Sequence, residues 1–185
     1  MRLITIIFVL FLIKDLNAQT QKGSWMLGGS ISSNLIFAED AFNFNISPGA
    51  GYFVLNGLAL GLQPSWGYAR SETPNTGFFK SYDYALTPSA KYFLKVNKVI
   101  YPFAGLSYGW NRTIGRSEKG TLDYDYSGNM LEFDTGILLF VNDFIGIENA
   151  AVYQRNDSEA TFTVRKNWTF RIGVRAFLPQ KAPRN

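Results

Sequence analysis

The 185-residue chain contains no cysteine and no histidine. Without cysteine it cannot form disulfide bonds, and it cannot carry a lipid anchor on a cysteine side chain. Histidine is the commonest general base and the commonest metal ligand, so its absence removes histidine-dependent catalysis and histidine-ligated metal sites from the candidate functions.

Charge is also scarce. Charged residues make up 17% of the chain, against about 25% in typical soluble domains. The net charge of +4 is small and dispersed, so it does not predict nucleic-acid binding. Aromatic residues, in contrast, reach 16%. No stretch after the N-terminal segment is long and apolar enough to predict a transmembrane helix.

Residues 1–18 are predicted to be a secretory signal peptide. Arg2 gives a basic start, an apolar run covers residues 3–13, and Ala18 is a small residue before the expected cleavage point. At 1.5 Å per residue this run is too short to cross roughly 30 Å of hydrocarbon as a helix. We therefore expect export and one domain, an outer-membrane β-barrel, over residues 19–185.

From Lys22 onward, apolar residues alternate with small or polar ones at a period of two, which is the signature of β-strands. Eight such segments are separated by turn-rich stretches, and the pattern from Ala41 to Leu55 is the clearest. In the seventh segment Asn149 interrupts the apolar stripe, which predicts a bulge or a one-residue phase change there. The fold class expected is all-β: an eight-stranded antiparallel up-and-down transmembrane β-barrel.

The connections predict how such a barrel is oriented. Asn56-Gly57, Asn97-Lys98 and Asn142-Asp143 are signals of tight hairpin turns. The stretches 71–79 and 112–128 are longer and polar, and we expect them to be loops. Short turns at one rim and long loops at the other are typical of an outer-membrane barrel, with the short turns periplasmic.

Alternation alone does not say which face points outward, and a soluble lipocalin-like barrel would place the apolar face inside. In that case the surface would be rich in glycine, serine and alanine and poor in lysine and glutamate, which favours neither strand stability nor solubility. In a membrane barrel the small-residue face lines a narrow interior. We therefore expect Leu60, Ile137 and Ile172 to face lipid, with Glu132 and Arg171 inside.

The small-residue face also carries most of the charge within the segments. We expect these side chains to form a buried ion-pair network that fills the interior. A selective path for ions or small solutes is the alternative. The network residues are Lys91, Glu132, Asp134, Glu148, Arg171 and Arg175.

Catalysis is not expected. Glu132 and Asp134 lie two apart on one strand face, but strands of this kind often carry such carboxylates structurally. The sequence contains no phosphate-binding glycine loop, metal-ligand cluster or nucleophile motif. We predict that the protein is not an enzyme and needs no cofactor or metal.

The stretch 112–128 is the best candidate for an external contact surface, because it mixes charged and aromatic residues as adhesive loops do. A simply solvated loop is the alternative. The candidate contacts for an extracellular ligand are Lys119, Asp123, Tyr124, Asp125 and Tyr126.

The last segment, Asn167 to Leu178, carries the most specific motif. Its alternating pattern resembles the C-terminal assembly signal of the outer-membrane β-barrel domain family, the group of small barrels that includes OmpX-like and OmpA-like transmembrane domains. The residues of this signal are Phe170, Ile172, Val174 and Phe177. Here residues 179–185 follow the motif, so its aromatic residue is not terminal.

This resemblance implies a porin-like protein of a Gram-negative outer membrane, with outer-membrane lipid and the barrel-assembly machinery as partners. The function expected is a structural or surface-interaction role with an ion-paired interior. A narrow porin or small-solute transporter and a soluble secreted lipocalin-like ligand-binding barrel are the two alternatives.

Overall fold

The computed structural model describes residues 20–36, 41–73, 77–117, 123–158 and 164–178. The predicted signal peptide lies outside these residues. All regular elements among them are strands: β1 (Trp25–Ile36), β2 (Ala41–Leu55), β3 (Leu58–Thr73), β4 (Gly77–Phe93), β5 (Ile100–Ser117), β6 (Tyr124–Phe140), β7 (Ile145–Ser158) and β8 (Val164–Leu178).

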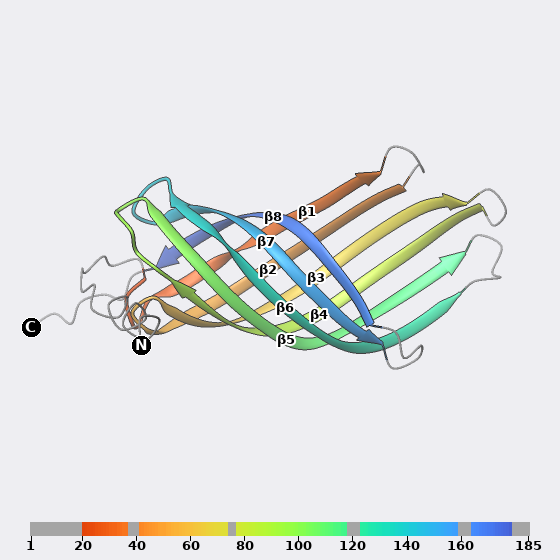
Figure 1. The fold of residues 1–185 in the computed structure, drawn as a ribbon, viewed down its shortest axis with the longest axis horizontal. Helices are drawn as coiled ribbons and strands as arrows, with labels where there is room; N and C mark the ends of the chain where they lie inside the picture. The colour runs from red at the N-terminus through yellow and green to blue at the C-terminus, as the bar shows by residue number, and fades with distance from the viewer. Residues whose placement is uncertain (1–19, 37–40, 74–76, 118–122, 159–163, 179–185) are drawn as a thin grey trace, which may run out of the picture.

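Each strand pairs antiparallel with its neighbours in sequence, and β1 pairs with β8 to close the barrel (Figure 1). The predicted eight-stranded up-and-down barrel is therefore confirmed. The closing pairing runs only from Trp25↔Leu178 to Ile31↔Ile172. The described residues contain no helix that is long and apolar enough to span a membrane.

The apolar face points outward, as predicted. Leu60, Ile137 and Ile172 are 48%, 45% and 62% exposed, whereas Glu132 and Arg171 are buried inside the barrel. In water such an outer wall would expose large apolar side chains along every strand. It is the surface of a barrel that faces hydrocarbon.

The predicted bulge at Asn149 is wrong. The pairing stays in register through this residue, which lies opposite Ile137 on β6 and Ile172 on β8. The phase of β7 is held by Glu148, whose side chain is fully buried in the interior. A one-residue shift would turn that carboxylate toward lipid, so Asn149 remains on the outer face.

The end of the barrel with connections 56–57, 94–99 and 141–144 is called the turn end here. Gly57 adopts a φ of +81° in its two-residue turn, and an added Cβ would lie 2.6 Å from the carbonyl oxygen of Phe93. In the other two connections an asparagine stabilises the turn. The Asn97 side-chain oxygen accepts hydrogen bonds from the backbone N–H groups of Val99 and Ile100, and Asn142 caps its own turn in the same way.

The opposite end, called the loop end, differs from the prediction. Most of the stretches 71–79 and 112–128, expected to be loops, belong to strands. The β3–β4 pairing continues to Thr73↔Gly77, and the β5–β6 pairing continues to Gly115↔Tyr124. Beyond the membrane both strand faces meet water, so the alternation that marks a strand disappears while the backbone pairing persists.

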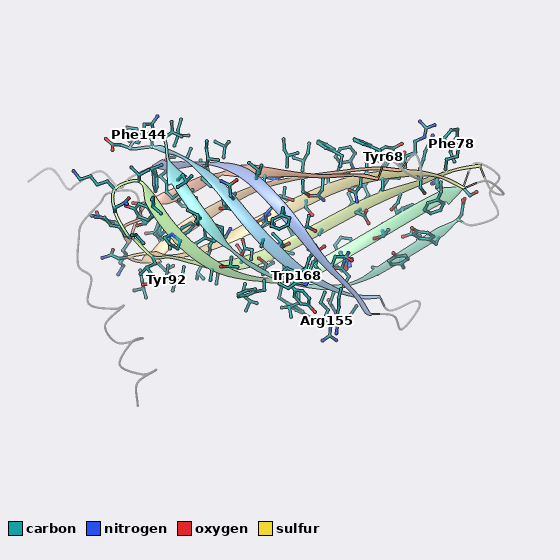
Figure 2. The ribbon with its side chains drawn as sticks, turned by 45° about the horizontal axis from the view of Figure 1, so that its top comes forward. Tyr68, Phe78, Tyr92, Phe144, Arg155 and Trp168 are labelled. Carbon is teal, nitrogen blue, oxygen red and sulfur yellow. The ribbon has the colours of Figure 1, made fainter. Side chains whose placement is uncertain are left out.

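Aromatic side chains frame the apolar belt. Tyr92 and Phe144 lie near the turn end, and Trp168 and Tyr68 lie toward the loop end (Figure 2). Past Trp168 on the same side of the barrel the outward positions become charged, as at Arg155, which pairs with Asp157 at 3.0 Å (Figure 2). The barrel wall therefore passes from an apolar belt to a region that we call the hydrophilic extension. Its outer face carries the exposed ion pairs of Arg112 with Asp125 and of Arg155 with Asp157.

Candidate functional site: the barrel interior

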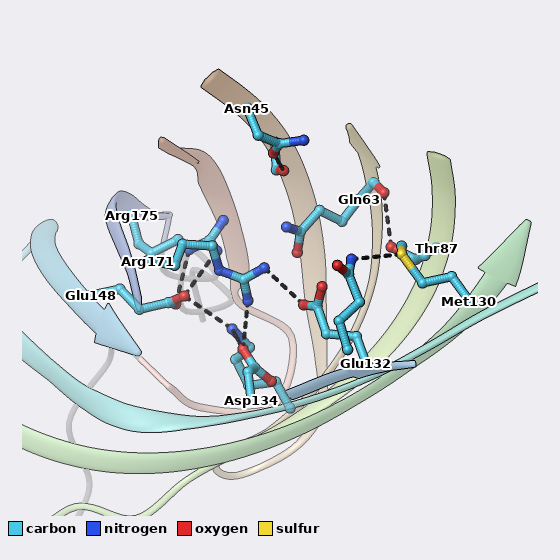
Figure 3. A network of polar contacts seen from close by, with 12 residues as sticks. Asn45, Gln63, Thr87, Met130, Glu132, Asp134, Glu148, Arg171 and Arg175 are labelled. Carbon is cyan, nitrogen blue, oxygen red and sulfur yellow. Dashed lines mark hydrogen bonds and ion pairs between the residues drawn. The ribbon is translucent and has the colours of Figure 1, made fainter. Parts of the chain in front are cut away.

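The six charged residues predicted for the interior lie together in one alternating chain of ion pairs (Figure 3). Arg171 contacts Glu132 at 2.8 Å and Asp134 at 2.9 Å. Lys91 then links Asp134, at 2.7 Å, to Glu148, at 3.1 Å.

Arg175 ends this chain. Its guanidinium makes two hydrogen bonds to Glu148, at 3.0 and 3.1 Å. The chain crosses the interior, because Lys91 projects from β4 to carboxylates on β6 and β7.

Three cations and three anions make this ion-pair chain electrically balanced, and each member is buried. Removal of one partner would leave an uncompensated charge in a site with little water. Gly105 makes room for the chain: an added Cβ would overlap Asp134 Oδ1 and lie 3.2 Å from the Lys91 Cε atom. The arrangement fills the middle of the barrel and joins four strands.

Below the ion-pair chain, toward the turn end, large apolar side chains pack against one another. Phe177 lies 4.8 Å from Phe140 between ring centroids, and 6.2 Å from Phe53. Phe93 contacts Phe53 at 5.9 Å and Phe103 at 5.5 Å. We call this set the aromatic plug: Met26, Phe53, Phe93, Tyr101, Phe103, Leu138, Phe140 and Phe177.

The sequence contains a signal for the plug that alternation alone does not reveal. On the otherwise small-residue face, the bulky residues fall beside the short turns, as with Phe53, Phe93 and Phe140. Side chains at the same end of neighbouring strands and on the same face must meet inside a narrow barrel. This positional clustering predicts a plug.

Residues preceding β1 cross the turn end and add to the closure. The Gly23 N–H donates a hydrogen bond to the Phe53 carbonyl, and the Phe53 N–H donates to the carbonyl of Ser24. The Gly57 N–H donates to the Thr20 carbonyl. Both Thr20 and Ser24 are buried.

Above the ion-pair chain, toward the loop end, the interior is hollow. A cavity of about 850 Å³ lies there, with Glu132 and Arg171 in its lining. The other inward side chains around it are mostly small or uncharged, including Asn43, Asn45, Ser47, Gln63, Ser65, Gly67, Ala69, Ala85, Thr87, Asn111, Thr113, Gln154, Asn156 and Thr169. We call this space the loop-side cavity.

The structure separates the residues proposed as external contacts. Tyr124 and Tyr126 belong to β6, line the loop-side cavity, and stack on each other at 5.1 Å. Asp123 accepts a hydrogen bond from the Ser117 backbone at 2.9 Å. Lys119 lies outside the described residues.

Asp125 lies on the exposed outer face of the hydrophilic extension. Its carboxylate accepts two hydrogen bonds from Arg112, at 2.9 and 2.6 Å. The hydrogen bond from Arg112 lowers the pKa of Asp125 below its ordinary value, and the same pairing raises the pKa of Arg112.

The residues of the proposed assembly signal point two ways. Phe170, Ile172 and Val174 face outward, with Phe170 86% exposed, whereas Phe177 is fully buried in the aromatic plug. Their role in assembly stays a prediction. Within the described part of the chain, no group of three or more acidic side chains is arranged to hold a metal ion.

No protein-family model matches the chain, and no curated protein sequence matches it significantly. Solved structures do match. Neisserial surface protein A superposes with a TM-score of 0.56 at 21% identity, covering 84% of this chain and 97% of that chain. The outer membrane protein OprG of Pseudomonas aeruginosa gives a TM-score of 0.59 at 13% identity, covering 88% and 99%.

A third similar structure is Ail of Yersinia pestis, in complex with the heparin analogue sucrose octasulfate. It has a TM-score of 0.53 and 16% identity, covering 85% of this chain and 100% of that chain. At these identities the likeness concerns the fold. The chain therefore shares its closed eight-stranded architecture with small bacterial outer-membrane β-barrels, in agreement with the family resemblance of its sequence.

Proposed function

We propose that the chain is an integral protein of the bacterial outer membrane with a structural or surface-interaction role, and that it is not a channel. The continuous apolar belt supports membrane insertion, because large side chains such as Leu60, Leu106 and Ile172 would otherwise face water. By analogy with barrels of this fold, the turn end faces the periplasm and the loop end faces outward.

We call the part of the interior from the ion-pair chain to the turn end the turn half. The non-channel role rests on the observation that both the ion-pair chain and the aromatic plug close it. A solute moving from the loop-side cavity would first meet the ion-pair chain, in which every charge has a partner. It would then meet the aromatic plug, in which Phe53, Tyr101, Leu138 and Phe177 are fully buried. Passage would require buried ion pairs to separate and packed rings to move, and both steps are costly.

Conductance in planar lipid bilayers tests this proposal. The protein is first shown to be folded by a shift in gel migration between heated and unheated samples. We expect no conductance at amounts of inserted protein at which an open porin gives discrete steps of current. Steady single-channel conductance by the folded protein would contradict the proposal and favour the porin alternative.

Cell fractionation tests the membrane location separately. We expect the protein to require detergent for extraction from the outer-membrane fraction, because its apolar belt must stay covered. Recovery of the folded protein in the periplasm without detergent would favour the soluble lipocalin-like barrel.

A further inference from the structure

In the wall of the loop-side cavity, β1 and β8 pair over a shorter length than either strand pairs with its other neighbour. The pairing between β1 and β8 ends at Ile31↔Ile172, but β1 continues to Ile36 beside β2, and β8 begins at Val164 beside β7. The two strands separate toward the loop end (Figure 1). Ser32 of β1 and Thr169 of β8, on either side of this seam, both line the cavity.

The seam begins above Ile31 and Ile172, at the level of the outer part of the apolar belt. Trp168 and Phe170 lie on its β8 side and are 71% and 86% exposed, and Ile172 below them faces lipid. Exposed apolar side chains thus lie beside the unpaired part of the cavity wall, where the apolar part of an amphipathic molecule would stay in the membrane.

The cavity wall carries no net formal charge. Its formally charged lining residues are Asp83, Glu132, Lys166 and Arg171, so the charges of the two signs cancel. Glu132 and Arg171 pair with each other, and Asp83 accepts a 2.6 Å hydrogen bond from Thr113. The wall thus offers an ionic ligand no cluster of like charges that would offset the water it loses on binding.

The wall is equally unsuited to a purely apolar ligand, because amides and hydroxyl groups dominate it. The side chain of Gln63 points into the interior (Figure 3). Asn45 accepts a hydrogen bond from Ser47 on its amide oxygen, which leaves its NH2 group as a donor. Higher in the cavity, the stacked rings of Tyr124 and Tyr126 offer apolar faces with polar edges.

We propose that the loop-side cavity binds an uncharged polyhydroxylated group, either a free saccharide or the sugar headgroup of a lipid that enters through the β1–β8 seam. Hydroxyl groups of such a ligand both donate to and accept from the amides of the wall. A volume of about 850 Å³ lies in the range of ordinary small-molecule sites, roughly 300–1,000 Å³. This inference rests on the proposed membrane orientation but not on the absence of conductance.

Saturation-transfer NMR on the barrel in phosphatidylcholine nanodiscs tests the proposal with three probes. Maltose represents the free neutral sugar, dodecyl maltoside carries the same headgroup on an alkyl chain, and sucrose octasulfate is the anionic counterpart. We expect binding of maltose, dodecyl maltoside or both, and none of sucrose octasulfate. Binding of the alkyl glycoside alone identifies a lipid headgroup as the source, and binding of maltose identifies a free saccharide.

Two variants assign the signal to the cavity. Ser65→Phe places a ring in the cavity and is expected to abolish binding. Gln63→Leu removes an amide of similar size and is expected to weaken binding about tenfold, the effect of one lost hydrogen bond. The matched control is Leu86→Phe, which adds a ring to the lipid-facing surface and should bind as the unaltered protein does.

Three results would overturn the inference: no binding of either neutral probe, binding unaffected by both cavity variants, or binding of sucrose octasulfate that Ser65→Phe removes. Gln63→Leu keeps the test decisive if Ser65→Phe does not fold. Bilayer conductance of the same preparation separates the two proposals. A conducting barrel that binds maltose contradicts the closed interior alone, and a silent barrel without binding contradicts the saccharide site alone.

Discussion

The two halves of the barrel interior share one wall but are built from different side chains. In the turn half the inward positions hold phenylalanine, lysine and arginine, and the space is filled. In the loop half the same face of the same strands holds Ser65, Gly67, Ala69 and Ala85, and a cavity remains. The size of the inward residues, with the strand number unchanged, therefore determines whether an eight-stranded barrel is closed or hollow.

Charged residues also differ between the closed interior and the outer surface. Buried charges in the turn half are matched pair by pair, as in the double hydrogen bond between Arg175 and Glu148. Outside, on the hydrophilic extension, Arg112 and Asp125 form a pair of the same kind in water, at 2.6 Å. The same chemical contact should therefore contribute very differently to stability at the two places.

The largest expected effect is the loss of a buried counter-charge. Glu148→Gln should destabilise the protein by about 3 to 5 kcal/mol, because it leaves the buried Arg175 without a carboxylate. Urea unfolding in lipid vesicles measures this change. Asp125→Asn, at the exposed pair, is the control, and equal destabilisation by the two substitutions would contradict the contrast.

Substitutions at two adjacent leucines on β6 compare how much stability comes from packing in the aromatic plug and how much from contact with lipid. Leu138 is fully buried in the aromatic plug, whereas Leu139 faces the membrane. Leu139→Ala should lose about 2 kcal/mol of transfer free energy. Leu138→Ala should lose about 1 to 2 kcal/mol more, because it also leaves a cavity that lipid cannot fill. Equal losses in the same unfolding assay would mean that the plug is loosely packed.

Alanine substitutions at two glycines compare how tightly the closed half and the loop half of the interior are packed. Gly105→Ala should cost about 1 to 3 kcal/mol, because its methyl group would overlap Asp134 in the ion-pair chain. Gly67→Ala, beside the loop-side cavity, should cost less, about 0.5 to 1 kcal/mol, because its methyl group meets Asn45 and Asp83 at a tight 3.2 Å and both side chains border open space. Unfolding midpoints measure both, and a tolerated Gly105→Ala would indicate a mobile ion-pair chain.

The smallest effect is expected at the exposed pair. Arg112 lowers the pKa of Asp125 from its ordinary 3.8, so the pairing stabilises the fold above that pH and is lost as the pH falls through the lower folded-state value. Stability of the unaltered protein and of Asp125→Asn should therefore differ slightly at pH 7 and converge in acid. High salt should reduce the difference at pH 7. A difference that persists in acid would point to another role for Asp125.

The sequence predicted the strand faces and the membership of the ion-pair chain, because both follow from a period of two. Even Lys91, three strands away from Glu148 along the wall, joins the chain, since a long side chain spans the narrow interior. The loop end could not be predicted as well. Alternation fades where both strand faces meet water, so the sequence around Ser117 and Tyr124 carries no period of two by which a strand could be predicted.

The β1–β8 seam and the phase of β7 depend on contacts between strands, so the pattern within one strand does not predict them. The seam between β1 and β8 depends on how two segments distant in sequence diverge. The phase at Asn149 is set by its neighbour Glu148 and by cations on β4 and β8, Lys91 and Arg175. A pattern within β7 alone therefore suggested a bulge where cross-barrel ion pairs keep the register.

The contrast between the halves is tested most directly by the reaction of single cysteines, since the chain has none of its own. Ser65→Cys lies in the loop-side cavity, and Ala59→Cys lies on the same face of β3 in the closed half. In lipid vesicles a polar, membrane-impermeant maleimide should label Cys at position 65 and leave Cys at position 59 unreacted until the protein is unfolded. Equally fast labelling at both positions in the folded barrel would contradict a closed turn half.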